Sequence, residues 1–158
     1  LRALCLAKLD RPVEARDLLL QLTRPPEGDN DVNAWIALGE VSFVLRDQSR
    51  LRQSASRVVG LAPQRPEGHT LRALAARSAG DLPAAVVAAR RAAELRPDAD
   101  TLTLLGLLQH ESGDVDAARQ TLGNAARLGG PDSPASRALA ALPAPGTPAI
   151  ATTPQDVR

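Results

Sequence analysis

The residues best suited to chemistry are few and far apart in this chain. The two histidines, His69 and His110, are 41 residues apart, and neither has a serine or cysteine nucleophile near it in sequence. Two histidines alone also lack the further ligands that a zinc site requires. Glu111 and Asp114 form an acidic pair at a turn, where helix capping accounts for them. We therefore predict that the chain is not an enzyme and has no catalytic residues and no metal site.

Cofactor chemistry has equally little support. Cys5 is the only cysteine, which excludes an intrachain disulfide and a cysteine-ligated metal, and favours a buried structural thiol. The sequence has no glycine-rich phosphate loop, and Gly129-Gly130 is placed as a helix terminator. The sequence therefore predicts no cofactor.

Arginines are the main reason to consider a nucleic-acid partner. They gather at 50–57 and 90–96, but the chain mixes 19 basic with 18 acidic residues and has a net charge of +1. Aromatic residues make up 1% of the chain, so bases have almost nothing to stack on. We interpret the arginines as a solvated outer face and predict no nucleic-acid partner. Since no run of 18 apolar residues occurs, we also predict no membrane insertion.

The elements that would position these residues are short helices. Apolar residues recur at three-to-four spacing, with aspartate or serine before most runs and proline or glycine after most of them. The predicted helices span 1–9, 13–22, 32–45, 48–61, 67–79, 82–95, 115–128 and 133–142. One more helix, before 115–128, begins after a cap at Asp98 or Asp100 and runs to His110 or Glu111. The prolines and glycine within 23–30 predict a loop, and the proline-rich stretch 143–158 predicts a disordered tail or linker.

The helices form pairs that repeat at intervals of 34 and 33 residues. Small residues recur at one position of the first helix, and closing residues recur after the second: Gly39, Ala73 and Gly106, then Pro63, Pro97 and Gly130. A second-helix position carries Leu51, Ala85 and Ala118. Small residues let two helices approach to the short end of the usual spacing of about 8–10 Å. One pair has too few large apolar residues for a core, so neighbouring pairs must supply it.

This pattern resembles the tetratricopeptide repeat (TPR) family. Trp35-Ile36-Ala37-Leu38-Gly39 matches the aromatic-x-x-Leu-Gly opening of the motif, Gly80-Asp81 and Gly113-Asp114 match its turn, and Pro63 and Pro97 match its closing proline. The resemblance covers residues 1–130. It implies an all-α, right-handed solenoid over 1–142, with three full pairs (31–64, 65–98, 99–131), a partial N-terminal pair (1–30) and a C-terminal capping helix (133–142).

The repeats depart from the family pattern in three positions. Leu51 is large where a small residue is expected. The tyrosine usual in the first helix is replaced by Ser42, Ala76 and Gln109. His69 and Leu102 stand where the family often has tryptophan. The array is therefore degenerate.

In TPR proteins, the first helices line a concave groove that usually takes a peptide or a helix. The repeat phase implies these partner-binding residues: Leu4, Lys8, Asn33, Ile36, Glu40, Phe43, Val44, Thr70, Leu74, Arg77, Ser78, Thr103, Leu107 and His110. We expect an exposed apolar strip through Ile36, Phe43, Leu74 and Leu107. Phe43 has an alternative role, in which it fills the core in place of Ser42.

The family's best-known groove grips a C-terminal carboxylate with asparagine and lysine. The matching positions here carry Leu4, Glu40, Leu74 and Leu107, so we do not expect that chemistry.

The function that the resemblance implies is a protein-interaction scaffold that takes a partner's peptide or helix in the groove. The alternative is an accessory domain of a larger bacterial protein, such as an envelope-assembly or polysaccharide-export component or a transferase, in which the stack positions a neighbouring domain. The chain begins at Leu1, without methionine and within a helical pattern, which indicates part of a longer protein. Two locations stay open, the cytoplasm as the default and the periplasm. Self-association through the ends of the stack also stays open.

Overall fold

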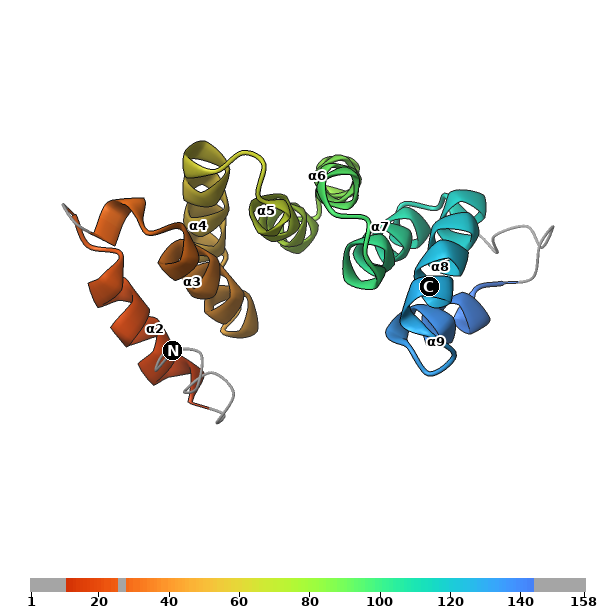
Figure 1. Ribbon diagram of the computed structural model, residues 1–158, viewed down its shortest axis with the longest axis horizontal. Helices are drawn as coiled ribbons and strands as arrows, with labels where there is room; N and C mark the ends of the chain where they lie inside the picture. Colours follow the sequence, from red (N-terminus) through yellow and green to blue (C-terminus); the bar gives the residue numbers. More distant parts are fainter. Residues whose placement is uncertain (1–10, 26–27, 144–158) are drawn as a thin grey trace, which may run out of the picture.

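All regular elements that the structure describes are helical. The structure, a computed structural model, describes residues 11–25 and 28–143. The α-helices within that part of the chain are α2 (Pro12–Leu22), α3 (Val32–Val44), α4 (Gln48–Leu61), α5 (Pro66–Ser78), α6 (Leu82–Leu95), α7 (Ala99–Glu111), α8 (Val115–Gly129) and α9 (Pro134–Ala141), with one 3-10 turn, η1 (Gly28–Asn30). Figure 1 shows them following one another along the long axis, from α2 at one end to α9 at the other.

This arrangement confirms the predicted all-α stack of helix pairs. The pairs are α3 with α4, α5 with α6, and α7 with α8, and each helix packs against the next one along the chain. The predicted loop 23–30 contains the short 3-10 turn η1. The end of α8 lies one residue later than predicted, because Gly129 is still helical and Gly130, with φ 84°, ends the helix. The predicted helix at 1–9 and the predicted tail lie largely or wholly outside the described residues, and the repeat boundaries stay predictions.

Aspartate side chains begin most of these helices. Each accepts a hydrogen bond from a backbone N–H of the first turn that has no partner within the helix. The capping residues are Asp31, Asp47, Asp81, Asp98 and Asp114. These caps explain why the helix starts could be placed from the sequence alone.

The turn inside each pair has the same backbone geometry three times. The N–H groups of Asp47, Asp81 and Asp114 donate to carbonyls five residues earlier, at 2.8, 3.0 and 2.9 Å. This 6→1 bond belongs to the Schellman motif, which requires a left-handed residue just before its donor. Two of the three left-handed residues are glycines, Gly80 and Gly113, but the first pair has Arg46 at φ 56°.

The helices approach one another most closely at the small residues of the repeat. A Cβ atom added to Gly39 would lie 2.6 Å from a methyl carbon of Leu71, and one added to Gly106 would lie 2.6 Å from Leu122 Cγ. Ala85 and Ala118, the small residues of the second helices, are fully buried. Leucine side chains therefore press directly against neighbouring backbone, as the repeat pattern predicted.

The buried side chains form three clusters along the stack. The first contains residues of the four helices α2, α3, α4 and α5, among them Trp35, Leu38 and Leu51. The second, between α5, α6 and α7, consists mostly of alanines. The third holds α9 on α8 around Leu122. Each cluster connects only neighbouring helices, as expected for a repeat protein.

Trp35 and His69, which occupy equivalent positions of the first and second pairs, make the same kind of contact. Trp35 Nε1 donates to the Asp29 carbonyl oxygen at 2.9 Å, and His69 Nε2 lies 2.9 Å from the Pro63 carbonyl oxygen. In both cases the carbonyl lies six residues before the ring. Because a carbonyl oxygen only accepts, the His69 contact places its hydrogen on Nε2. His69 is thus a buried packing residue, as predicted, and it also ties the preceding loop to α5.

The unusual conformation of Arg46 generates the first prediction. The left-handed region costs a residue with a Cβ atom about 1–2 kcal/mol, whereas glycine loses about 0.5–1 kcal/mol more in entropy on folding. Arg46→Gly should therefore stabilise the fold by about 0.5–1 kcal/mol. Urea unfolding followed by circular dichroism measures this change. The converse control, Gly80→Ala, should destabilise the fold by about 1 kcal/mol; an unchanged midpoint in both variants would contradict the turn assignment.

Candidate partner-binding surface

The predicted groove residues are divided between two cavities and several separate places. Glu40, Thr70 and Leu74 line one cavity of about 250 Å³. A second cavity, of about 470 Å³, is lined in part by Phe43, Val44 and Ser78. The predicted residues therefore include members of both cavities, although we expected them to form one continuous groove.

The first cavity, here called the Glu40 pocket, lies where the first helices of the three pairs meet. Its lining residues are Glu40 of α3, Glu67, Thr70, Leu71 and Leu74 of α5, Arg96 of the α6–α7 connection, and Asp100, Thr101 and Leu104 of α7. Three leucines give it apolar walls, and the remaining lining residues are polar or charged. An apolar cavity with a few polar groups is the usual form of a binding site.

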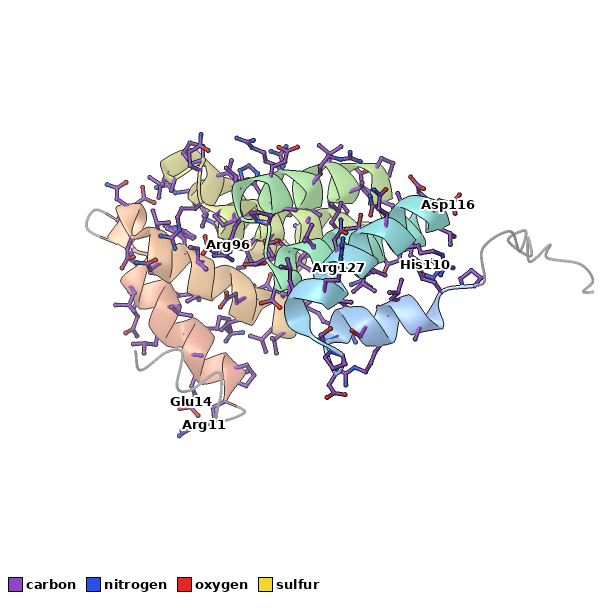
Figure 2. All side chains as sticks on the ribbon, turned by 45° about the vertical axis from the view of Figure 1, so that its right-hand side comes forward. Arg11, Glu14, Arg96, His110, Asp116 and Arg127 are labelled. Carbon is purple, nitrogen blue, oxygen red and sulfur yellow. The ribbon has the colours of Figure 1, made fainter. Side chains whose placement is uncertain are left out.

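Glu67 is the acidic residue of the pocket with the most ionic contacts. Its carboxylate accepts from Arg65 Nε and from Arg96 Nη1, each at 3.0 Å. Arg96 also pairs with Asp98 at 2.7 Å, so its charge is shared between two carboxylates. Figure 2 shows Arg96 near the middle of the stack. Although partial burial acts to raise the pKa of Glu67, the hydrogen bonds from its own backbone amide, Arg65 and Arg96 outweigh it and lower the pKa.

Glu40 has the opposite electrostatic surroundings. No cation of the described residues forms an ion pair with it, and its pKa is raised, first by desolvation and then by the negative charge of Glu67. The side chain still reaches solvent, but surrounding protein removes enough water to disfavour its charged form. Glu40 therefore brings an uncompensated negative charge into a cavity with apolar walls.

The second cavity, here called the end pocket, lies at the turn of the first pair and the end of α5. Its lining residues are Ser42, Phe43, Val44, Arg46, Gln48, Leu51 and Ser78. Phe43 is 39% exposed and Val44 67% exposed. Ser42 is itself fully buried, and its Oγ donates to the Leu38 carbonyl at 2.6 Å. Phe43 therefore does not replace Ser42 in the core, although much of its ring is covered.

Ile36, which was predicted to contact a partner, is buried. Ile36 is only 8% exposed and belongs to the same buried cluster as Ala15 and Leu19 of α2. The expectation of an exposed strip through Ile36 was therefore wrong, because α2 of the partial N-terminal pair packs on α3. Leu107 is half-buried.

The other predicted residues make local or inter-repeat contacts. Arg77 forms a two-bond ion pair with Glu111, at 2.8 and 2.5 Å, between equivalent helices of adjacent pairs. Asn33 accepts from Arg65, and Thr103 Oγ1 donates to the Ala99 carbonyl. His110 is exposed. Leu4 and Lys8 lie outside the described residues, and partner binding at all these positions stays a prediction.

The predicted residues do not include six that line the Glu40 pocket and lie on or beside the first helices: Glu67, Leu71, Arg96, Asp100, Thr101 and Leu104. The predicted residues follow one line along the first helices. The pocket also uses a second line about one turn earlier, and it does so at equivalent positions of two helices: Glu67 and Leu71 of α5 stand 33 residues before Asp100 and Leu104 of α7. Testing the positions one turn before each predicted residue would have found Glu67, Asp100 and Leu104.

Many of the arginines from the two arginine-rich stretches pair with acids. Arg50 pairs with Asp47, Arg57 with Asp29, and Arg91 with Glu94. Within residues 11–25 and 28–143, no three His, Cys, Asp or Glu side chains are grouped as metal ligands. In the same ranges, no helix is both long and apolar enough to cross a bilayer.

The raised pKa of Glu40 predicts a pH-dependent stability. A carboxyl group with a higher pKa in the folded state binds protons more tightly there, so its charge destabilises the fold above that pKa. The destabilisation declines as the pH falls through the folded-state pKa and is gone below the unfolded-state pKa. Glu40→Gln should therefore raise the melting temperature at pH 7 by a small amount, because the group is partly solvated. The difference should disappear below about pH 4, where an ordinary glutamate is also protonated.

Differential scanning calorimetry of the wild type and Glu40→Gln between about pH 3 and 8 provides the measurement. Glu94→Gln, an exposed change on α6, is the matched control. A lower melting temperature for Glu40→Gln at pH 7 would mean that a cation already compensates Glu40.

The partial exposure of Phe43 predicts a moderate stability loss on truncation. A fully buried phenylalanine costs about 3–5 kcal/mol when changed to alanine, so Phe43→Ala should cost about 1–2 kcal/mol. Val44→Ala, at a more exposed neighbour, should change stability by less than about 0.5 kcal/mol. Urea unfolding measures both variants. A loss of about 3 kcal/mol or more for Phe43→Ala would make it a core residue after all.

Comparison with known proteins places this arrangement among solved repeat structures. The chain is similar to a thermophilic TPR protein of Thermus thermophilus, with a TM-score of 0.75 and 24% identity over 89% of this chain and 77% of that one. It is also similar to PilW, a type IV pilus biogenesis factor (TM-score 0.72, 18% identity, 87% of this chain and 63% of that one). A third similar structure is MamA (TM-score 0.68, 19% identity, 78% of this chain and 71% of that one).

These similarities are structural. No protein-family model and no curated protein sequence matches the chain. The stacked pairs, the small-residue contacts and the Schellman turns recur at the period of the TPR motif, and a solved TPR protein superposes on most of the chain. The chain therefore has the TPR fold, a right-handed α-solenoid of degenerate helix pairs.

Proposed function

We propose that this chain is a non-catalytic protein-interaction scaffold and that the Glu40 pocket anchors a partly apolar peptide or helix of a partner protein. The observation that supports this most is the position of the pocket: it opens between the first helices of all three pairs, with walls from Leu71, Leu74 and Leu104. Exposed apolar surface at a concave place is typical of an interaction site.

The end pocket extends the same surface along the helices. Phe43 follows Glu40 by three residues on α3, and Ser78 follows Leu74 by four residues on α5, so each pair is about one helical turn apart. A partner segment that runs parallel to α3 and α5 would contact both cavities. Phe43 and Val44 would then provide the second apolar contact, which makes a peptide of more than a few residues the best match.

The energetic contribution of such contacts is concentrated in few residues. Interfaces commonly depend on a small number of buried anchors surrounded by near-neutral contacts. Leu74 combines a pocket-lining position with partial exposure, so it can contact a partner without being the centre of the core. It is therefore the most informative residue to change.

A selection experiment with a phage-displayed library of peptides about 12 residues long tests this function. Peptides selected on the wild-type chain should lose about tenfold or more in affinity for Leu74→Gln, a loss of at least about 1.4 kcal/mol. The matched control is Val87→Gln on α6, where the side chain is 69% exposed and lies outside both pockets. Fluorescence anisotropy measures affinity, and circular dichroism checks that the variants stay folded.

Two outcomes would contradict the proposed function. Selected peptides that bind Leu74→Gln as tightly as the wild type would place the binding surface elsewhere. Failure of the library to yield any peptide that binds the folded chain would remove the support for a peptide groove.

A further inference from the structure

The acidic residues around the Glu40 pocket have different structural explanations. Glu67 and Asp100 lie in the first turns of α5 and α7, where negative charge interacts favourably with the helix dipole. Glu40 is in the last third of α3, beyond the reach of the dipole at its N-terminus, and it caps no helix. Neither helix capping nor an ion pair within the described residues accounts for it.

The charges that line the pocket are mainly negative. Glu40, Glu67 and Asp100 face only one cation among the lining residues, Arg96. Arg96 is already bonded to Glu67 and Asp98, and the described residues provide no ion-pair partner for Asp100. A carboxylate from a partner would therefore meet like charge, whereas a cation would meet two unpaired carboxylates.

The apolar walls restrict the kind of cation that fits. Leu74 and Leu104, which are partly exposed, provide hydrocarbon surface beside the acids, in a cavity of about 250 Å³ whose lining also includes the buried Leu71. Lysine and arginine combine a long apolar stem with a charged end, and they bury the stem while the charge stays at a polar edge. A hydrated metal ion would leave the leucine walls without a contact.

We propose that the Glu40 pocket binds a lysine or arginine side chain of the partner segment, with the stem against the leucine walls and the charged group at Glu40 and Asp100. This inference rests on the proposed function and adds the chemistry of the partner: a basic residue next to apolar ones. The raised pKa of Glu40 agrees with it, because an incoming cation would relieve the unfavourable charge.

The test compares selections on two forms of the chain. The same peptide library is selected on the wild type and on Glu40→Lys. Wild-type peptides should be enriched in lysine or arginine beside leucine, isoleucine or phenylalanine, and Glu40→Lys peptides should carry aspartate or glutamate instead. The leading wild-type peptide is then synthesised with its basic residue and with glutamine in that place.

Affinity measurements on these two peptides form a double-mutant cycle. The basic peptide should bind Glu40→Gln about fivefold or more weakly than the wild type, while the glutamine peptide should bind both forms equally. Raising the salt concentration should weaken the basic peptide most on the wild type, less on Glu40→Gln, where Asp100 remains, and should leave the glutamine peptide nearly unchanged. Glu94→Gln on α6 is the control and should leave both affinities unchanged.

Each alternative result has a distinct meaning. Peptides that depend on Leu74 but contain no enriched basic residue, or that bind Glu40→Gln undiminished, would overturn this inference and leave the proposed function standing. Peptides that bind Leu74→Gln as tightly as the wild type would overturn the proposed function, and this inference with it. Concentration-dependent dimerisation that Glu40→Lys abolishes would identify a second copy of this chain as the occupant and also overturn the inference.

Discussion

Close approach between helices at glycine and alanine is the constraint on which this structure depends. The chain has one tryptophan and one phenylalanine, so large rings cannot fill the spaces between helices. Leucines fill them instead, and they reach the neighbouring backbone only where that backbone carries no side chain or a methyl group, as at Gly39 and Gly106. This packing fixes the separation of α3 from α5 and of α7 from α8. The α3–α5 separation in turn bounds the Glu40 pocket on the side of the first pair.

The reversal of the chain between the two helices of each pair depends on a second, local feature. A Schellman turn ends the first helix, and the aspartate that closes this turn caps the next helix at once, as at Asp81 and Asp114. Ion pairs then connect adjacent units, such as Arg77 with Glu111 and Arg96 with Glu67. Exposed ion pairs contribute little to stability, so their main effect is on the register between units.

Helix positions could be predicted from the sequence because they depend on local signals. Aspartate caps, left-handed glycines and closing prolines act within one turn, and the helix bounds followed them to within one or two residues. The burial of Ile36 could not be predicted in this way, because it depends on the packing of α2 against α3. The lining of the Glu40 pocket depends likewise on how two neighbours meet, so periodicity identified Glu40 and Leu74 but missed Asp100 and Leu104.

The alanine-rich cluster between α5, α6 and α7 has a mechanical consequence. Alanine methyl groups make far fewer dispersion contacts than leucine or tryptophan side chains, so this cluster resists deformation less than the one around Trp35 and Leu38. Small changes of angle between the second and third pairs therefore require little energy. Residues of both α5 and α7 line the Glu40 pocket, so its walls lie on both sides of this alanine-rich cluster. A partner segment bound there, as proposed, would connect the second and third pairs and limit changes of the angle between them.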